Sequence, residues 1–179
     1  MLKLNRNPRM NEDAETTRWY RDIALAVNQL VDSVTTLLAY AATNSMVRLN
    51  TANGYGSTNT KIRRFTNVVT NQGSDITYAD SPTLGASFTI NTAGMYSVSF
   101  TDQYSAIEAA VITLNDSAPT ATPVTADILD GHTQTTGNLY AFCSWSGYLA
   151  AGAVIRARSY SGTTTGAGAA AQFTIAKVG

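Results

Sequence analysis

The stretch from Tyr20 to Ala41 reads YRDIALAVNQLVDSVTTLLAYA, and the rest of the chain is best understood from it. Its apolar residues alternate spacings of three and four, which places them on the seam of a helix that supercoils with other helices. The residues of this seam are Tyr20, Ile23, Val27, Leu30, Val34, Leu37 and Ala41. A single amphipathic helix could pack on its own domain with the same stripe, so the spacing alone leaves both arrangements open.

The spacing predicts a helix that begins near Asn11 and ends near Ala42, where Thr43-Asn44-Ser45 breaks the pattern. Asn11 can cap the helix, and the acidic residues Glu12 and Asp13 complement the positive end of its dipole. A helix of some 30 residues is roughly 45 Å long.

The composition of the seam bears on how many helices associate. Val at a positions with Ile or Leu at d positions favours a coiled coil of two helices. Small or apolar residues at the flanking e and g positions widen the apolar face, and they are Ala24, Val31, Leu38 and Ala26. A wider apolar face suits a coiled coil of three helices, or a helix that also packs on something else. We expect three helices.

From Met46 onward the sequence changes to short alternating runs typical of β-strands. The clearest are Phe88–Ile90, Tyr96–Phe100, Val111–Leu114, Val154–Arg158 and Phe173–Val178. Turn signals such as Asn53-Gly54 and Asp130-Gly131 separate the runs. Many short strands at this spacing predict a mainly β sandwich or barrel. We therefore divide the chain into an extended tail (1–11), a helical stalk (12–45) and a β head (46–179).

Charge and composition exclude several classes of function. Twelve basic and twelve acidic residues balance, so no net field recruits nucleic acid. No apolar run approaches the roughly 20 residues that cross a bilayer, so we expect no membrane insertion. The first residues lack the apolar region of a secretory signal, which predicts synthesis and folding in a reducing cytoplasm. A single cysteine, Cys143, rules out an intrachain disulfide.

The head resembles the complement-type globular head and tumour necrosis factor-like jelly rolls. Four segments match motifs of that family in the family's order: Gly94–Phe100, Val111–Asp116, Leu149–Arg156 and Ala171–Ile175. The stretch from Ile62 to Ile90 also resembles bacteriophage versions of this head. The likeness covers residues 46–179, with two departures: Ala153 stands where the family has Asp, and the closing Phe-x-Gly is absent.

The resemblance implies a jelly-roll β-sandwich on a coiled-coil-like stalk, assembled as a homotrimer whose heads pack through flat, aromatic-rich faces. It further implies a non-enzymatic structural protein of a bacteriophage virion, a head fibre or capsid decoration bound to the major capsid or another virion protein. The alternative is a tail fibre or receptor-binding tip that recognises a host surface glycan or protein.

The tail is the predicted attachment segment, with anchoring residues Leu2, Leu4, Arg6, Arg9 and Met10. A frayed terminus is the equal alternative for such a short peptide. Core or inter-subunit packing in the head is predicted for Phe88, Tyr96, Val98, Phe100, Val154, Phe173 and Ile175. The aromatic residues Tyr140, Trp145 and Tyr148 are either a sugar-stacking surface or a buried inter-subunit cluster, and burial is the preferred interpretation.

No motif for catalysis, metal or cofactor binding is found. His132 lies near Asp127 and Asp130, but a lone His in a glycine turn is far more often a loop residue than a zinc ligand. The pairs Asp75 with Asp80 and Asp127 with Asp130 are conceivable glycosidase carboxylates. Asp in loops rich in Asn, Gly and Ser usually serves turns, so we expect no enzymatic activity.

Overall fold

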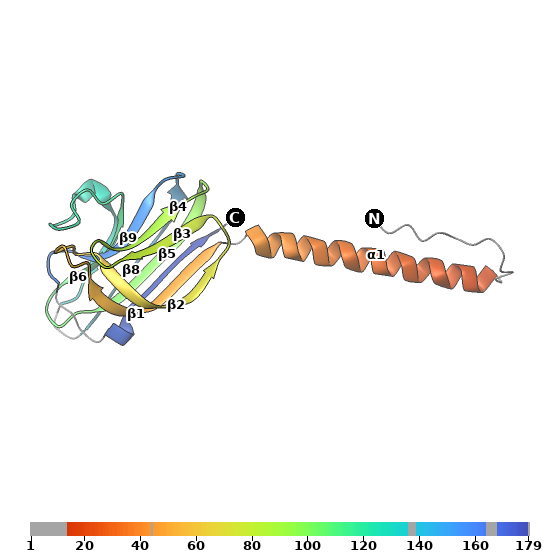
Figure 1. The fold of residues 1–179 in the computed structure, drawn as a ribbon, viewed down its shortest axis with the longest axis horizontal. Helices are drawn as coiled ribbons and strands as arrows, with labels where there is room; N and C mark the ends of the chain where they lie inside the picture. Colours follow the sequence, from red (N-terminus) through yellow and green to blue (C-terminus); the bar gives the residue numbers. More distant parts are fainter. Residues whose placement is uncertain (1–13, 44, 136–138, 164–167, 179) are drawn as a thin grey trace. The chain divides into compact units, whose positions relative to one another are not determined.

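The computed structural model describes residues 14–43, 45–135, 139–163 and 168–178 (Figure 1). The chain forms two compact units, Met1–Ala42 and Thr43–Gly179. The first contains the helix and the second, which we call the head, contains every strand of the described residues. No helix in these ranges is both long and apolar enough to span a bilayer.

The helix, α1, runs from Ala14 to Thr43. It contains no Gly or Pro, and its hydroxyl residues do not interrupt it. The hydroxyl groups of Ser33, Thr35 and Thr36 each donate a hydrogen bond to the carbonyl four residues earlier, at 2.8–2.9 Å. These polar side chains therefore find their hydrogen-bond acceptors within the helix itself. The predicted helix is confirmed, although Asn11, its predicted cap, lies outside the described residues.

The head is a sandwich of two antiparallel sheets, with five strands each over the described residues. The first sheet has the order β2-β1-β10-β5-β8 and the second has the order β3-β4-β9-β6-β7. The strands are β1 (Met46–Tyr55), β2 (Arg63–Gln72), β3 (Ile76–Ser81), β4 (Gly85–Ile90), β5 (Gly94–Gln103), β6 (Ala109–Leu114), β7 (Ile128–Thr133), β8 (Tyr140–Leu149), β9 (Val154–Ser159) and β10 (Gln172–Lys177). The described residues also form two short 3₁₀ helices, Thr125–Asp127 and Gly168–Ala170.

Each sheet combines strands from both halves of the head, which is the interleaving of a jelly roll. The first strand pairs with the last, Val47 opposite Ile175, so both ends of the head belong to one sheet. This observation confirms the prediction of a mainly β fold preceded by one N-terminal helix.

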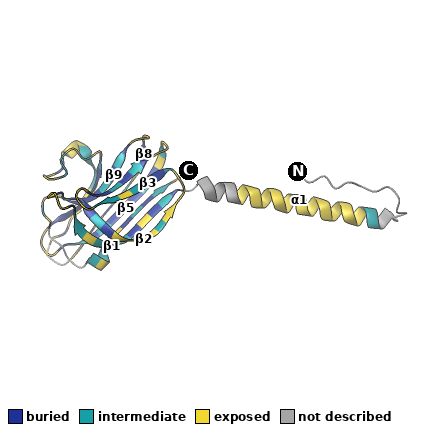
Figure 2. Cartoon of the chain, viewed as in Figure 1, coloured by how far each residue is buried: buried dark blue, intermediate teal, exposed yellow. Residues whose placement is uncertain are grey.

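The core lies between the sheets and follows from alternation along the strands. On β5, Tyr96, Val98 and Phe100 are buried, while the residues between them face outward (Figure 2). The centre is aromatic: the rings of Phe88 and Phe173 stack across the two sheets with centroids 4.1 Å apart.

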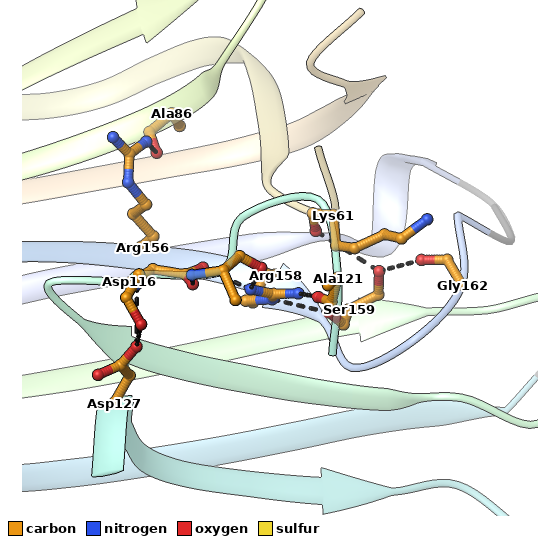
Figure 3. Close-up of polar contacts among 11 residues, drawn as sticks. Lys61, Ala86, Asp116, Ala121, Asp127, Arg156, Arg158, Ser159 and Gly162 are labelled. Atoms are coloured by element: carbon orange, nitrogen blue, oxygen red, sulfur yellow. Dashed lines mark hydrogen bonds and ion pairs between the residues drawn. The ribbon is translucent and has the colours of Figure 1, made fainter. Parts of the chain in front are cut away.

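The loop between β6 and β7 lies over the outer face of the second sheet. We call its residues 115–124 the strap. The strap is held by Arg158, which lies on β9 and is fully buried. Its guanidinium pairs with Asp116 at 2.5 Å and donates to the carbonyls of Ala118, at 3.0 Å, and Ala121 (Figure 3). Thr113, an outward residue of β6, has no exposed surface either. The outer side of this sheet is therefore partly closed by the chain itself.

Candidate assembly interface

The seam residues of α1 from Tyr20 to Leu37 are exposed in the structure. Ile23, Val27 and Val34 are 41%, 51% and 46% exposed, and Leu30 reaches 64% (Figure 2). Tyr20 and Leu37 are exposed as well. Monomeric proteins rarely leave so long an apolar stripe in water, because each buried side chain gains about 1.5–3 kcal/mol.

The positions that flank the seam are uncharged too. From Trp19 to Ser33 the e and g positions hold Trp19, Ala24, Ala26, Val31 and Ser33. Dimeric coiled coils commonly place Glu and Lys at these positions, where they form interhelical ion pairs. The charged residues of the helix between residues 18 and 37 lie elsewhere on its circumference, at Arg18, Arg21, Asp22 and Asp32.

Other predicted assembly residues lie wholly or partly outside the residues that the structure describes. The side chain of Ala41 is outside it, and so are the anchoring residues Leu2, Leu4, Arg6, Arg9 and Met10. At the N-terminal end of the seam, Tyr20 packs edge-on against Trp19 with ring centroids 5.2 Å apart.

The predicted packing residues of the head fall into two groups. One group is buried in the core: Phe88, Tyr96, Val98, Phe100, Phe173 and Ile175. The other is Val154, which is only half-buried because it occupies an outward position at the start of β9. Its backbone N–H donates to the side chain of Asn115 at 2.9 Å.

The structure also reveals a buried ion pair that sequence reasoning missed. Arg63 on β2 and Asp102 on β5 are almost completely buried, and the guanidinium donates to both carboxylate oxygens, one at 2.6 Å. The guanidinium also lies 4.6 Å from the ring centre of Tyr55. Desolvation by burial raises the pKa of Tyr55 to about 12. A charged residue in phase with the inward residues of its strand was the available signal, since Arg63 precedes the core residue Phe65 by two positions.

The carboxylates considered for glycoside hydrolysis are held in structural contacts. Asp75 accepts from Ser45 at 2.9 Å and pairs with Lys177, while Asp80 pairs with Arg64 at 2.7 Å. A hydrogen bond from Thr92, followed by those from Ser45 and Lys177, lowers the pKa of Asp75. A general acid of this reaction needs the opposite shift, because its carboxyl must stay protonated.

The carboxylates of the second pair, Asp127 and Asp130, also accept structural hydrogen bonds. Hydrogen bonds from the hydroxyl and backbone N–H of Ser117 lower the pKa of Asp127. Asp130 accepts from the backbone N–H of Ser144 at 2.7 Å. His132 is directed elsewhere and stacks on the ring of Phe142, with centroids 5.1 Å apart. Within the described ranges, no three His, Cys, Asp or Glu residues gather as metal ligands would.

The three aromatic residues of β8 separate by face. Trp145 points inward and packs against the core, whereas Tyr140 and Tyr148 point outward and are 58% and 65% exposed. Trp145 is therefore packed within its own chain, whereas burial of the two tyrosines between subunits stays a prediction. The alternation of β8 accounts for the separation, because residues at odd and even positions face opposite sides.

Comparison with solved structures bears on the fold of the head. Crystal structures of murine APRIL at pH 8.0 and pH 5.0 are similar to it with TM-scores of 0.53 and 0.50, each at 12% identity over 75% of this chain and 99% of the other. The globular domain of zebrafish complement 1qA covers 76% of this chain and 95% of its own at 12% identity, with a TM-score of 0.46. No protein-family model matches the sequence, and no curated relative matches it. The similarity to APRIL shows that the head has a tumour necrosis factor-like jelly-roll fold.

Proposed function

We propose that the chain is a non-enzymatic structural protein that assembles through α1 into a homotrimer and projects its jelly-roll head as an appendage of a bacteriophage virion. The N-terminal segment attaches the trimer to the capsid, as a head fibre or decoration protein does. The bacteriophage part of the proposal rests on the sequence resemblance of residues 62–90 and on the N-terminal anchoring pattern.

The exposed seam of α1 is the observation that carries this proposal. A stripe of alternating three- and four-residue spacing, uncovered by its own unit, is matched in shape and chemistry by the same stripe on another copy. The uncharged flanks favour three helices over two, because they make each helix apolar toward two neighbours. The tumour necrosis factor-like head supports the same number, given the trimer that its family resemblance implies.

Two leucines on opposite sides of α1 provide a matched test. Leu30 lies on the seam and Leu25 lies on the far side, and both are more than half exposed. Sedimentation equilibrium of the full chain should give three chains of 19.0 kDa each, about 57 kDa in total. Leu30→Asp should dissociate the assembly to single chains, whereas Leu25→Asp, with the same loss of helix propensity, should leave it trimeric. A wild-type mass of one chain would overturn the proposal.

Attachment requires a separate experiment. A chain lacking residues 1–11 should remain trimeric and fail to sediment with virus particles that bind the full chain. If the shortened trimer still bound particles, the anchoring role of Leu2, Leu4 and Met10 would be wrong. If it bound host cells as strongly as the full chain does, the receptor-binding alternative would replace the capsid appendage.

A further inference from the structure

The pair Asn53-Gly54, which the sequence marks as a turn signal, lies within β1 at a break in its pairing. The register of β1 with β2 shifts between Ala52 and Tyr55, so Asn53 and Gly54 together stand opposite a single residue of β2. Such a β-bulge leaves one residue out of the hydrogen-bonded ladder. The ladder on the other side of β1, with β10, covers Met46–Asn50 and ends before the pair. The backbone of this pair is therefore less restrained than that of the paired residues.

The pair also has open space around it. Gly54 has a φ of +70°, in the left-handed region, and a Cβ placed on it would meet no atom within 4 Å. The side chain of Asn53 is exposed to solvent. Because glycine has no Cβ to obstruct the approach, the side chain of Asn53 can come close to the backbone nitrogen of Gly54.

We propose that Asn53 is a site of spontaneous covalent modification, at which it is converted to a mixture of aspartate and isoaspartate. A base in water removes the amide proton of Gly54, and the nitrogen attacks the side-chain carbonyl carbon of Asn53. A new C–N bond forms, the bond to the side-chain nitrogen breaks, and ammonia leaves with a proton from water. A water molecule then opens the resulting succinimide ring at either carbonyl. One water is consumed and one ammonia released, and neither oxidant nor enzyme is required.

A second pair of similar sequence shows why the fold decides the outcome. Asp130-Gly131 can isomerise through the same ring, but β7 holds both residues in register, with Asp130 opposite Ile112 and Gly131 opposite Val111. The carboxylate of Asp130 also accepts the backbone N–H of Ser144 at 2.7 Å. A Cβ at Gly131 would lie 3.3 Å from Val111, so there is little room for the backbone to rotate. We therefore expect Asp130 to stay unmodified in the native head.

Conversion of Asn53 changes both the charge and the backbone of the head. The chain carries twelve basic and twelve acidic residues, so one new carboxylate takes its net charge from zero to −1. Isoaspartate also adds one backbone atom to β1, at a position where the bulge already accommodates an extra residue. The modified head should therefore stay folded and accumulate as a more acidic form. The reaction takes place within one chain, so it does not require the proposed trimer.

Peptide mapping by mass spectrometry tests this in the full-length chain, kept at pH 8.5 and 37 °C with and without urea. Asn53 should convert in the native protein within about tenfold of its rate in urea, whereas Asp130 should isomerise more than tenfold slower in the native protein. Asn67 is the asparagine control, because it is exposed on β2 but paired with Asn50 and followed by the branched Val68. Native conversion of Asn53 more than tenfold slower than in urea would overturn the proposal, as would equal conversion of Asn67.

A variant that keeps the amide supplies the second half of the test. The side chain of Asn53→Gln is one methylene longer and would have to close a six-membered ring, which forms far more slowly. Isoelectric focusing of stored wild-type protein should show an acidic species that grows with time. The variant, with an unchanged circular dichroism spectrum, should show none. Equal growth of the acidic species in both proteins would mean that another amide reacts, and it would overturn the assignment to Asn53.

Discussion

The residues that determine the stability of the head include charged side chains in its interior. Arg63 with Asp102 and Arg158 with Asp116 are fully or almost fully buried pairs. A buried pair is worth little against an apolar replacement of both partners, but loss of one partner leaves a charge without compensation. These four residues are therefore among the most sensitive charged positions of the head.

Asp102→Asn should lower the free energy of unfolding by about 3–5 kcal/mol, because Arg63 then remains buried without its carboxylate. Asp80→Asn is the matched control at the partly exposed pair with Arg64, and it should cost less than about 1 kcal/mol. Urea unfolding of each variant measures the difference. Equal costs would mean that Arg63 finds another compensating group.

The thiol of Cys143 should be almost unreactive toward alkylating reagents in the native protein. Burial raises its pKa to about 12, so at pH 8 about one thiol in 10,000 is ionised, against about a quarter at the usual pKa of about 8.5. Because only the thiolate reacts, labelling by iodoacetamide should be at least about 1,000-fold slower in buffer than in urea. Rapid native labelling would indicate that β8 opens.

At the scale of elements, much of the secondary structure was accessible from sequence and the buried polar contacts were not. The 3-4 spacing predicts α1, and alternation predicts β5 through Tyr96, Val98 and Phe100, because both patterns are local. The strap is not predictable in this way, since Arg158 binds carbonyls some 40 residues away in the chain. Exposure of Tyr140 likewise depends on the strand register, which the spacing of aromatic residues does not reveal.

Substitutions at two arginines of β9 test whether Arg158 holds the strap in place. Arg158→Met removes the group that holds Asp116 and the carbonyls of Ala118 and Ala121 (Figure 3). Cleavage by a nonspecific protease between residues 117 and 126 should then accelerate at least tenfold. Arg156→Met is the control, because that side chain makes one hydrogen bond, to the carbonyl of Ala86 at 3.2 Å. Similar cleavage of both variants would show that Arg158 does not fix the strap.

The association of α1 should depend little on salt. Its seam and flanking positions are uncharged, so no interhelical ion pairs are available for ions to screen. The dissociation constant of the proposed trimer, measured by sedimentation, should change less than about threefold between 0.05 and 0.5 M NaCl. A large weakening at high salt would mean that Arg21, Asp22 or Asp32 makes contacts between chains.

At the scale of the whole molecule, α1 and the head lie in separate compact units, and the proposed assembly of α1 would join several copies of the head. Self-association stabilises the associated form by mass action, so its midpoint depends on protein concentration. The sequence predicted this two-part organisation because the hydrophobic period changes from a helical to a strand pattern at Met46. It did not predict the order of strands in each sheet, since that order depends on pairing between segments far apart in the sequence.

The thermal midpoint of the wild-type chain should therefore rise with concentration. Leu30→Asp should melt at a lower temperature that is the same at 2 and 200 μM, and calorimetry at both concentrations measures the effect. A concentration-independent midpoint for the wild-type chain would mean that assembly contributes nothing to its stability.

The placement of β1 has a mechanical consequence. This strand begins the head at Met46 and is hydrogen-bonded on both flanks, to β2 and to β10, while Ser45 just before it is bound to Asp75 and Lys177. Tension that enters the head from the chain ahead of Ser45 and acts along β1 loads these perpendicular bonds in shear, all at once. A head pulled by its N-terminal end should yield only at high force, which suits the proposed attachment to a particle.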